Sequence, residues 1–290
     1  MARPFRSRHA LGIFAALGAL TIFVACQSDA PTPLAPNQSA STARAGYDTP
    51  GMHRQYGPPV KVGDGMARAY VVLNAKEGQA PVELGIALDQ KALDGLPADG
   101  MEYAYDLALP THAPAPWQFA ELDWNPHGHV PAGVYDVPHF DFHFYMVSQA
   151  ARDAIDPSDP QFAAKASNLP MGSYVPPFYI VPGPPAAVAV PHMGVHWLDV
   201  RSPELQGLLG NPGAYEPFTK TFIYGSWDGQ FTFLEPMVTR AYLLSQPDVT
   251  SPISVPAQYA QSGWYPTSYH VTYDAQAKEY RVALSGMTAH

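Results

Sequence analysis

The chain has 290 residues, of which 14% are charged, and its formal net charge at pH 7 is -9. A surface this acidic repels nucleic acid and anionic lipid headgroups, so we expect no nucleic-acid partner. The 32 prolines and the scarcity of charge favour short strands and ordered loops over long surface helices.

The first 26 residues are typical of a bacterial lipoprotein signal. Three arginines within the first eight residues precede an uncharged run over 10–25, which is shorter than the ~20 apolar residues of a membrane span. Cys26, the only cysteine, follows the small residue Ala25, as in a lipobox. We expect residues 1–25 to be removed and Cys26 to be lipidated, which anchors the protein in the membrane of the bacterial cell envelope, facing the periplasm or the exterior. An ordinary signal peptide with an incidental cysteine is the alternative.

Removal of this segment would leave 13 basic against 25 acidic residues, a net charge of -12. Buried acyl chains contribute ~0.8 kcal/mol per CH₂, so such an anchor needs no basic patch. With Cys26 lipidated, no thiol is left for a disulfide, a nucleophile or a metal ligand. Residues 26–57 are rich in Ser, Ala, Pro and Thr and are expected to form a flexible tether. Residues 58–290 are expected to form a single globular domain.

Alternating and paired apolar runs predict a β-rich α+β domain of antiparallel sheets, either a sandwich or an open barrel, with a few short helices. The expected strands are 66–73, 82–88, 102–109, 139–146, 218–224, 230–235, 269–273 and 279–284. Asp228-Gly229 predicts a tight hairpin turn. Ser148 is expected to cap one helix, and Asp159 with Pro160 a second one. Residues 237–245 fit a helix or a strand, and the proline-rich segment 169–191 is expected to be a long ordered loop or a domain-crossing segment.

Six of the eleven histidines lie between residues 127 and 196. Two segments, 139–143 and 192–196, each carry histidines four residues apart. On a strand His139, Asp141 and His143 share one face, but the two histidines are then about 13 Å apart, too far for one ion. Neighbours on that face are about 6.6 Å apart, which one ion can bridge. The local unit is therefore His139–Asp141 or Asp141–His143.

If the two segments pair side by side, one histidine from each strand meets the other at both ends, ~5 Å apart, with Asp141 between the pairs. Glu235, expected on the strand face of Phe231 and Phe233, would join them or pair with Arg240, because a carboxylate among phenylalanines needs a partner. A donor set without sulfur suits Zn²⁺, Mn²⁺, Fe²⁺ or Cu²⁺. The predicted metal ligands are His139, Asp141, His143, His192, His196 and Glu235. His127-Gly-His129 has two-ligand spacing but is expected in a loop, where exposed histidines are common.

The favoured hypothesis is a lipid-anchored envelope protein with a His/carboxylate metal site. Enzymatic activity stays open; a metal-dependent hydrolase or oxidoreductase would use metal-activated water, with Asp141 or Glu235 as base or orienting group. One alternative is a structural or interaction homo-oligomer whose histidines form a core hydrogen-bond network. Another is a small-molecule or glycan binder that uses Trp124, Trp197 and Trp227. The sequence has no nucleotide-binding glycine motif, and Gly225–Gly229 lacks the spacing of a nucleophile elbow.

Several of these stretches together resemble a bacterial envelope domain family of unknown function. They are residues 124–131, 138–146, 193–197, 218–226 and 233–237, and HFDFHFYM at 139–146 is the most distinctive. Members of that family include a thermophile protein controlled by an extracytoplasmic stress sigma factor. The resemblance spans about residues 60–285 and implies a β-rich fold and a homo-oligomer. It implies no activity, metal or catalytic residue.

Overall fold

The computed structural model describes residues 3–4, 50–100 and 102–290. Apart from Arg3 and Pro4, the predicted signal segment lies outside the described residues, as do Cys26 and most of the predicted tether. Within the described part of the chain, no helix combines the length and apolar character that a membrane crossing requires.

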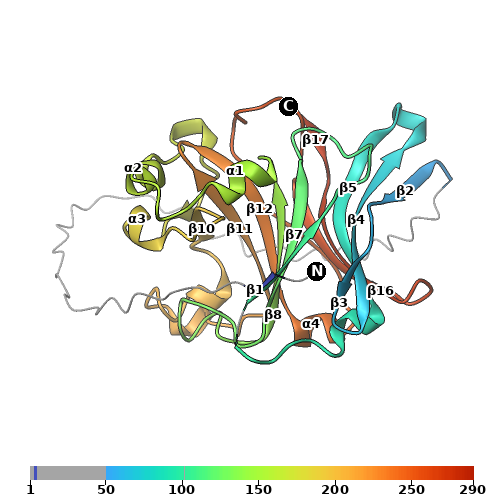
Figure 1. Ribbon diagram of the computed structural model, residues 1–290, viewed down its shortest axis with the longest axis horizontal. Coiled ribbons are helices and arrows are strands. Elements are labelled where there is room, and N and C mark those ends of the chain that lie inside the picture. Colours follow the sequence, from blue (N-terminus) through green and yellow to red (C-terminus); the bar gives the residue numbers. More distant parts are fainter. Residues whose placement is uncertain (1–2, 5–49, 101) are drawn as a thin grey trace, which may run out of the picture.

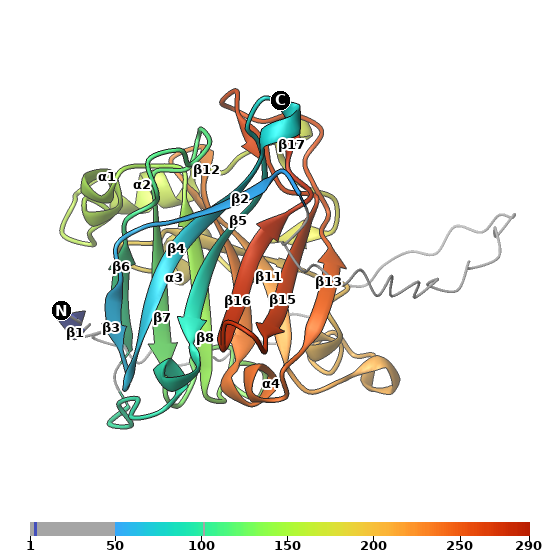
Figure 2. The ribbon, with the colours of Figure 1, turned by 90° about the vertical axis from the view of Figure 1, so that its right-hand side faces the viewer.

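Two antiparallel sheets pack face to face as an open sandwich (Figures 1 and 2). The larger sheet has the order β1 (Arg3–Pro4), β6 (Tyr103–Leu107), β7 (Phe119–Asn125), β8 (His139–Tyr145), β12 (Gln230–Thr239), β11 (Lys220–Trp227), β10 (Val195–Asp199) and β9 (Tyr179–Ile180). The second has the order β13 (Asp248–Pro252), β15 (Ser268–Asp274), β16 (Glu279–Ser285), β5 (Ala80–Asp89), β4 (Gly65–Asn74) and β2 (Met52–Tyr56), with β3 (Val60–Val62) also on β4. A small ladder joins β14 (Trp264–Tyr265) to β17 (Thr288–Ala289). The predicted β-rich antiparallel fold is confirmed.

The core between the sheets follows from strict alternation along the strands. Phe140, Phe142 and Phe144 of β8 are fully buried and pack in one cluster with residues of the opposite sheet such as Val71 and Leu84. Burial of each such side chain contributes about 1.5–3 kcal/mol. Because side chains alternate, the remaining residues of β8 must point to the outer face of the eight-stranded sheet. This alternation places the histidines of β8 on that outer face.

The predicted hairpins are confirmed by the pairing of β4 with β5, β11 with β12, and β15 with β16. Asp228 and Gly229 both have positive φ, as a tight hairpin turn requires. The ambiguous segment 237–245 is divided: β12 continues to Thr239, and helix α4 (Arg240–Leu244) follows. The predicted tether, residues 26–57, overlaps the sheet near its end, because Met52–Tyr56 pair with β4.

The two short helices after β8 agree only partly with the sequence. Ser148 caps α1 (Gln149–Asp153), since its hydroxyl accepts from the amide of Ala151. The predicted cap at Asp159 is wrong, because α2 (Phe162–Ser167) begins later and has no side-chain cap. The carboxylate of Asp159 instead accepts from the amide of Gln161 and organises the preceding turn.

Replacement of Ser148 by alanine is expected to lower the free energy of unfolding by about 1 kcal/mol, because an amide of the first turn of α1 loses its acceptor. Urea unfolding of wild type and variant measures this difference. Ser148→Asp is the matched control and should retain nearly all of the stability. Equal stability of Ser148→Ala and wild type would contradict the capping role.

The outer face of the eight-stranded sheet is covered rather than exposed. Figure 1 shows α1, α2 and α3 (Pro185–Val188) on this side, away from the seven-stranded sheet. Two further clusters of apolar side chains lie on the same face, one around Met237 and one around Phe233. Polar side chains of the outer face are therefore removed from water: His139, His143 and Asp123 are fully buried.

Candidate metal centre

The register of the sheet lines up polar side chains in rows across its covered outer face. Asn125 of β7 is opposite His139 of β8, and Asp123 is opposite Asp141. In the next row Glu121 is opposite His143. Glu235 of β12 is opposite His143 on its other side, because Leu234 pairs with Phe144 and Met237 with Asp141. A hydrophobic sheet face would carry apolar residues here, so these rows form a buried polar site.

Three side chains of this face converge into what we call the Glu235 triad: His143, His196 and Glu235. The Nε2 atoms of the two histidines each lie 3.5 Å from Oε2 of Glu235. The two histidines belong to neighbouring rows of the sheet. The centroids of their rings are 6.4 Å apart, and the ring planes are nearly perpendicular. The oxygen and the two nitrogens therefore face a common point.

Gly225 explains how His196 reaches this triad from β10. His196 pairs with Gly225 of β11, which in turn pairs with Phe233 of β12. The ring of Phe233 lies over Gly225, so that a Cβ atom at this position would be only 1.9 Å from Cζ of Phe233. The missing side chain leaves room for the Phe233 ring, against which the imidazole of His196 packs with ring centroids 5.3 Å apart.

Burial keeps both histidines of this triad neutral. Desolvation lowers the pKa of His143 to about 3 and that of His196 to about 4. Nδ1 of His143 lies 2.9 Å from Oδ2 of Asp123, and neither ring nitrogen of His143 has a hydrogen-bond partner. A neutral imidazole with one nitrogen beside a carboxylate and a lone pair on the other is the form that binds a metal ion.

A second group, the Asp141 triad, consists of His129, His139 and Asp141. Nε2 of His139 lies 3.1 Å from Oδ1 of Asp141, and Nε2 of His129 lies 3.4 Å from Oδ2. Asn125 donates a 2.7 Å hydrogen bond to Oδ2, which fixes the carboxylate. Although burial opposes it, the charges and hydrogen bonds of His139 and His129 hold the pKa of Asp141 below its usual range.

The charges on this face are unbalanced among the described residues. The groups within ion-pair distance of Asp123, Asp141 and Glu235 are all histidines. Burial, and then neighbouring carboxylates, raise the pKa of Asp123 and of Glu235 well above the usual range. Burial and the charge of Asp141 likewise raise the pKa of Glu102 to about 7. A bound cation would lower these pKa values, because a nearby positive charge favours the ionised carboxylates.

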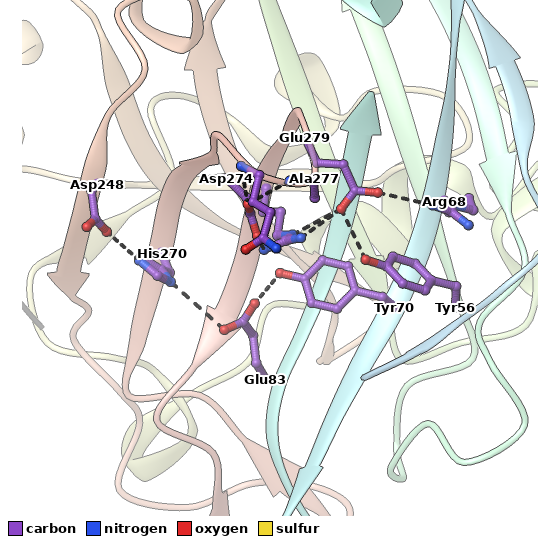
Figure 3. A network of polar contacts seen from close by, with 11 residues as sticks. Tyr56, Arg68, Tyr70, Glu83, Asp248, His270, Asp274, Ala277 and Glu279 are labelled. Atoms are coloured by element: carbon purple, nitrogen blue, oxygen red, sulfur yellow. Dashed lines mark hydrogen bonds and ion pairs between the residues drawn. The ribbon is translucent and has the colours of Figure 1, made fainter. Parts of the chain in front are cut away.

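Carboxylates on the outer face of the seven-stranded sheet have other partners (Figure 3). There Glu279 pairs with Arg68 and Arg281, and Arg281 also binds Asp274 at 2.7 Å. Glu83 and Asp248 of that sheet lie beside His270.

On the eight-stranded sheet Arg152 pairs with Glu121, whereas Asp123, Asp141 and Glu235 have only histidines within ion-pair distance among the described residues. These three carboxylates are therefore the ones suited to a cation from solution.

Five of the six predicted ligands are brought into the two triads, and one is not. His192 lies apart, with Nδ1 3.1 Å from the carbonyl oxygen of Asp153. The predicted pairing of segments 139–143 and 192–196 is wrong, because β12 and β11 lie between β8 and β10. The predicted meeting of histidine pairs around Asp141 is wrong for the same reason.

The surroundings of Glu235 also differ from the prediction. A register shift near Ser226 turns Phe231 toward the sandwich core, so only Phe233 shares the outer face with Glu235. Arg240 is no partner of Glu235, since its guanidinium donates to the carbonyl of Leu93.

Sequence reasoning missed Asp123, Asn125 and the participation of His129. The signal for the first two was the alternation in Glu121-Leu-Asp-Trp-Asn125, which marks a strand with one polar face. His129 gave only the weak signal of a histidine in a Gly-Pro loop. Trp124 and Trp197, considered as a ligand platform, are buried in the core instead.

Comparisons with family models, with curated proteins and with solved structures find no match for this chain. The resemblance to an envelope domain family therefore stays a prediction. What the described residues establish is three buried or partly buried His/carboxylate groups that could hold metal ions. They are the two triads and a third group, Glu121, Asp123 and His143, which shares His143 with the Glu235 triad.

Proposed function

We propose that this chain is a metal-binding protein of the bacterial cell envelope whose Glu235 triad holds one divalent transition-metal ion. The observation that carries the proposal is the 3.5 Å separation of Oε2 of Glu235 from both imidazole Nε2 atoms. Ligand atoms 2.0–2.1 Å from a tetrahedral zinc ion lie about 3.3 Å from one another. A slight contraction around an ion would bring Oε2 of Glu235 and each Nε2 atom to that distance.

The surroundings of the triad support the same proposal. Metal-binding histidines usually present their second nitrogen to a carboxylate or a carbonyl, and Asp123 has this position beside His143. Two imidazoles and one carboxylate leave one position of a tetrahedral ion open, which is typical of catalytic rather than structural zinc sites. The side chain of His196 is 19% exposed, so the open position is expected to lie on its side of the triad.

Zinc is the metal that best fits this donor set. Nitrogen and oxygen donors without sulfur also suit manganese, iron and copper, but the short bonds and tetrahedral geometry of zinc match the 3.5 Å separations within the triad. At a zinc concentration one hundred times the Kd, binding to the folded state alone would raise the free energy of unfolding by about 2.7 kcal/mol.

Zinc titration of chelator-treated protein tests the proposal, with elemental analysis as the readout. Wild type is expected to regain zinc together with a higher melting temperature. His143→Gln and His196→Gln should each lose the zinc equivalent of this triad. His112→Gln is the control, because that histidine is exposed and contacts Gln55 outside both triads.

Two results would overturn the proposal. One is folded, metal-free protein that takes up no zinc, which would favour the alternative of a hydrogen-bond network. The other is full zinc content in His143→Gln and His196→Gln.

A further inference from the structure

We infer that the Asp141 triad is a second, independent site for a divalent transition-metal ion. It shares no residue with the Glu235 triad, so the inference does not depend on occupancy of that site. The two ions would lie on the same covered face of the eight-stranded sheet, held by neighbouring outward residues of β8.

Backbone carbonyl groups decide which nitrogen of each histidine ring faces Asp141. Nδ1 of His139 lies 2.7 Å from the carbonyl oxygen of Val137, and Nδ1 of His129 lies 2.7 Å from that of Val130. A carbonyl oxygen can only accept, so each Nδ1 carries hydrogen. The Nε2 atoms of both rings face the carboxylate of Asp141, at 3.1 Å for His139 and 3.4 Å for His129, so what joins each ring to the carboxylate must be positive, either a second ring proton or a metal ion.

A metal ion can take the place of the ring proton that would otherwise join each imidazole to Asp141. Nε2 of His139 and Oδ1 of Asp141 are 3.1 Å apart, yet both are buried atoms without a hydrogen-bond partner. Buried polar atoms left without a partner lose their hydration with nothing in return, which destabilises the fold. A metal ion between them uses both lone pairs, and the spacing is close to the about 3.3 Å of tetrahedral zinc ligands.

Each ligand of this triad is also held by a partner on its far side. The two carbonyl oxygens fix the imidazole rings, and the amide of Asn125 fixes Asp141. The ring of Phe218 packs edge-on against His139 with centroids 5.4 Å apart. Such second contacts preorganise metal ligands, and their loss typically lowers metal affinity 10–100-fold.

The charge on this face fits two ions better than one. Asp123 lies between the triads, opposite Asp141 and beside His143. Together with Glu235 and the nearby Glu102, these carboxylates carry four negative charges when ionised. Two divalent ions balance that charge. Asp141 and His143 are two residues apart on β8, about 6.6 Å between Cα atoms, so the sites are separate yet close.

The Asp141 triad differs from the other triad in its access to solvent. The side chain of His129, from the loop between β7 and β8, is 35% exposed, whereas that of His139 is fully buried. An ion here would exchange through the His129 side. The chemistry of the donor set again selects a borderline ion such as Zn²⁺ or Co²⁺.

The test is zinc stoichiometry of chelator-treated protein and its variants, with Co²⁺ absorption as a second readout. Wild type is expected to bind two equivalents, His129→Gln one, His196→Gln one, and the double variant none. His129→Gln is chosen because this partly exposed residue can change without opening the core. His127→Gln is the matched control, two residues away in the same loop and exposed.

The outcomes separate the two sites. One equivalent in wild type that only His196→Gln removes would overturn this inference and leave the proposed function standing. One equivalent that only His129→Gln removes would support this inference and overturn the proposed function. One equivalent lost in both variants would mean a single shared ion and would overturn the independence of the sites.

Asn125→Ala gives a further check on the Asp141 triad. It should weaken one zinc equivalent 10–100-fold and leave the other unchanged, because Asn125 bonds Asp141 and no residue of the Glu235 triad. Two unchanged affinities would contradict the assignment of Asp141 as a ligand.

Discussion

Arg152→Met is expected to cost about 3–5 kcal/mol of the free energy of unfolding. Arg152 of α1 is only 5% exposed, and its guanidinium pairs with Glu121 of β7 and lies 2.9 Å from Asp106 of β6. Methionine retains much of the side-chain volume but leaves Glu121, itself 3% exposed, as an uncompensated buried charge. Urea unfolding monitored by tryptophan fluorescence measures the difference.

Two comparisons identify the cause of that loss. Arg152→Met combined with Glu121→Gln should recover a large part of the stability, because the buried charge is gone. Arg201→Met is the surface control: its pair with Asp199 is half-exposed, and its expected cost is about 0–1 kcal/mol. A double variant whose cost equals the sum of the two single costs would show that the pair does not act as described.

Gly225→Ala is expected to lower the free energy of unfolding by about 1–3 kcal/mol and to abolish zinc binding at the Glu235 triad. The new methyl group would lie 1.9 Å from the ring of Phe233, between two paired strands that cannot separate. The ring must move toward His196 and Glu235, and it then displaces both ligands. Urea unfolding and zinc stoichiometry give the two effects.

Gly213→Ala is the matched control for this substitution. A Cβ at Gly213 meets no atom within 4 Å, so its stability should change by less than about 0.5 kcal/mol and its zinc content not at all. If Gly225→Ala kept full stability and both zinc equivalents, the role of this glycine in forming the triad would be wrong.

The sequence predicts the strands well where local patterns decide them. The alternation His139 to Met146 identifies β8 and also which face holds its phenylalanines. The Asp228-Gly229 turn identifies a hairpin because only a few residues tolerate positive φ at both positions. These features depend on neighbours in the chain, so a single sequence contains them.

The candidate site is less predictable because it depends on sheet order. Whether β10 lies beside β8 or two strands away is decided by long-range pairing, which periodicity does not encode. His196 reaches Glu235 only through the space above Gly225, and His192 is turned away in a loop with positive φ. The register shift places Phe231 and Phe233 on opposite faces of the sheet, and the alternation of residues in the sequence does not predict it.

The triads draw their members from different parts of the chain, and this has a mechanical consequence. His143 and Glu235 lie on adjacent strands, whereas His196 follows His143 by about fifty residues that include α1, α2 and α3. An ion bound to all three would act as a cross-link that closes this long excursion, and such clips restrict the unfolded chain more as the closed segment lengthens. Chelation would then loosen the covering layer first, while the sandwich beneath it keeps its pairing.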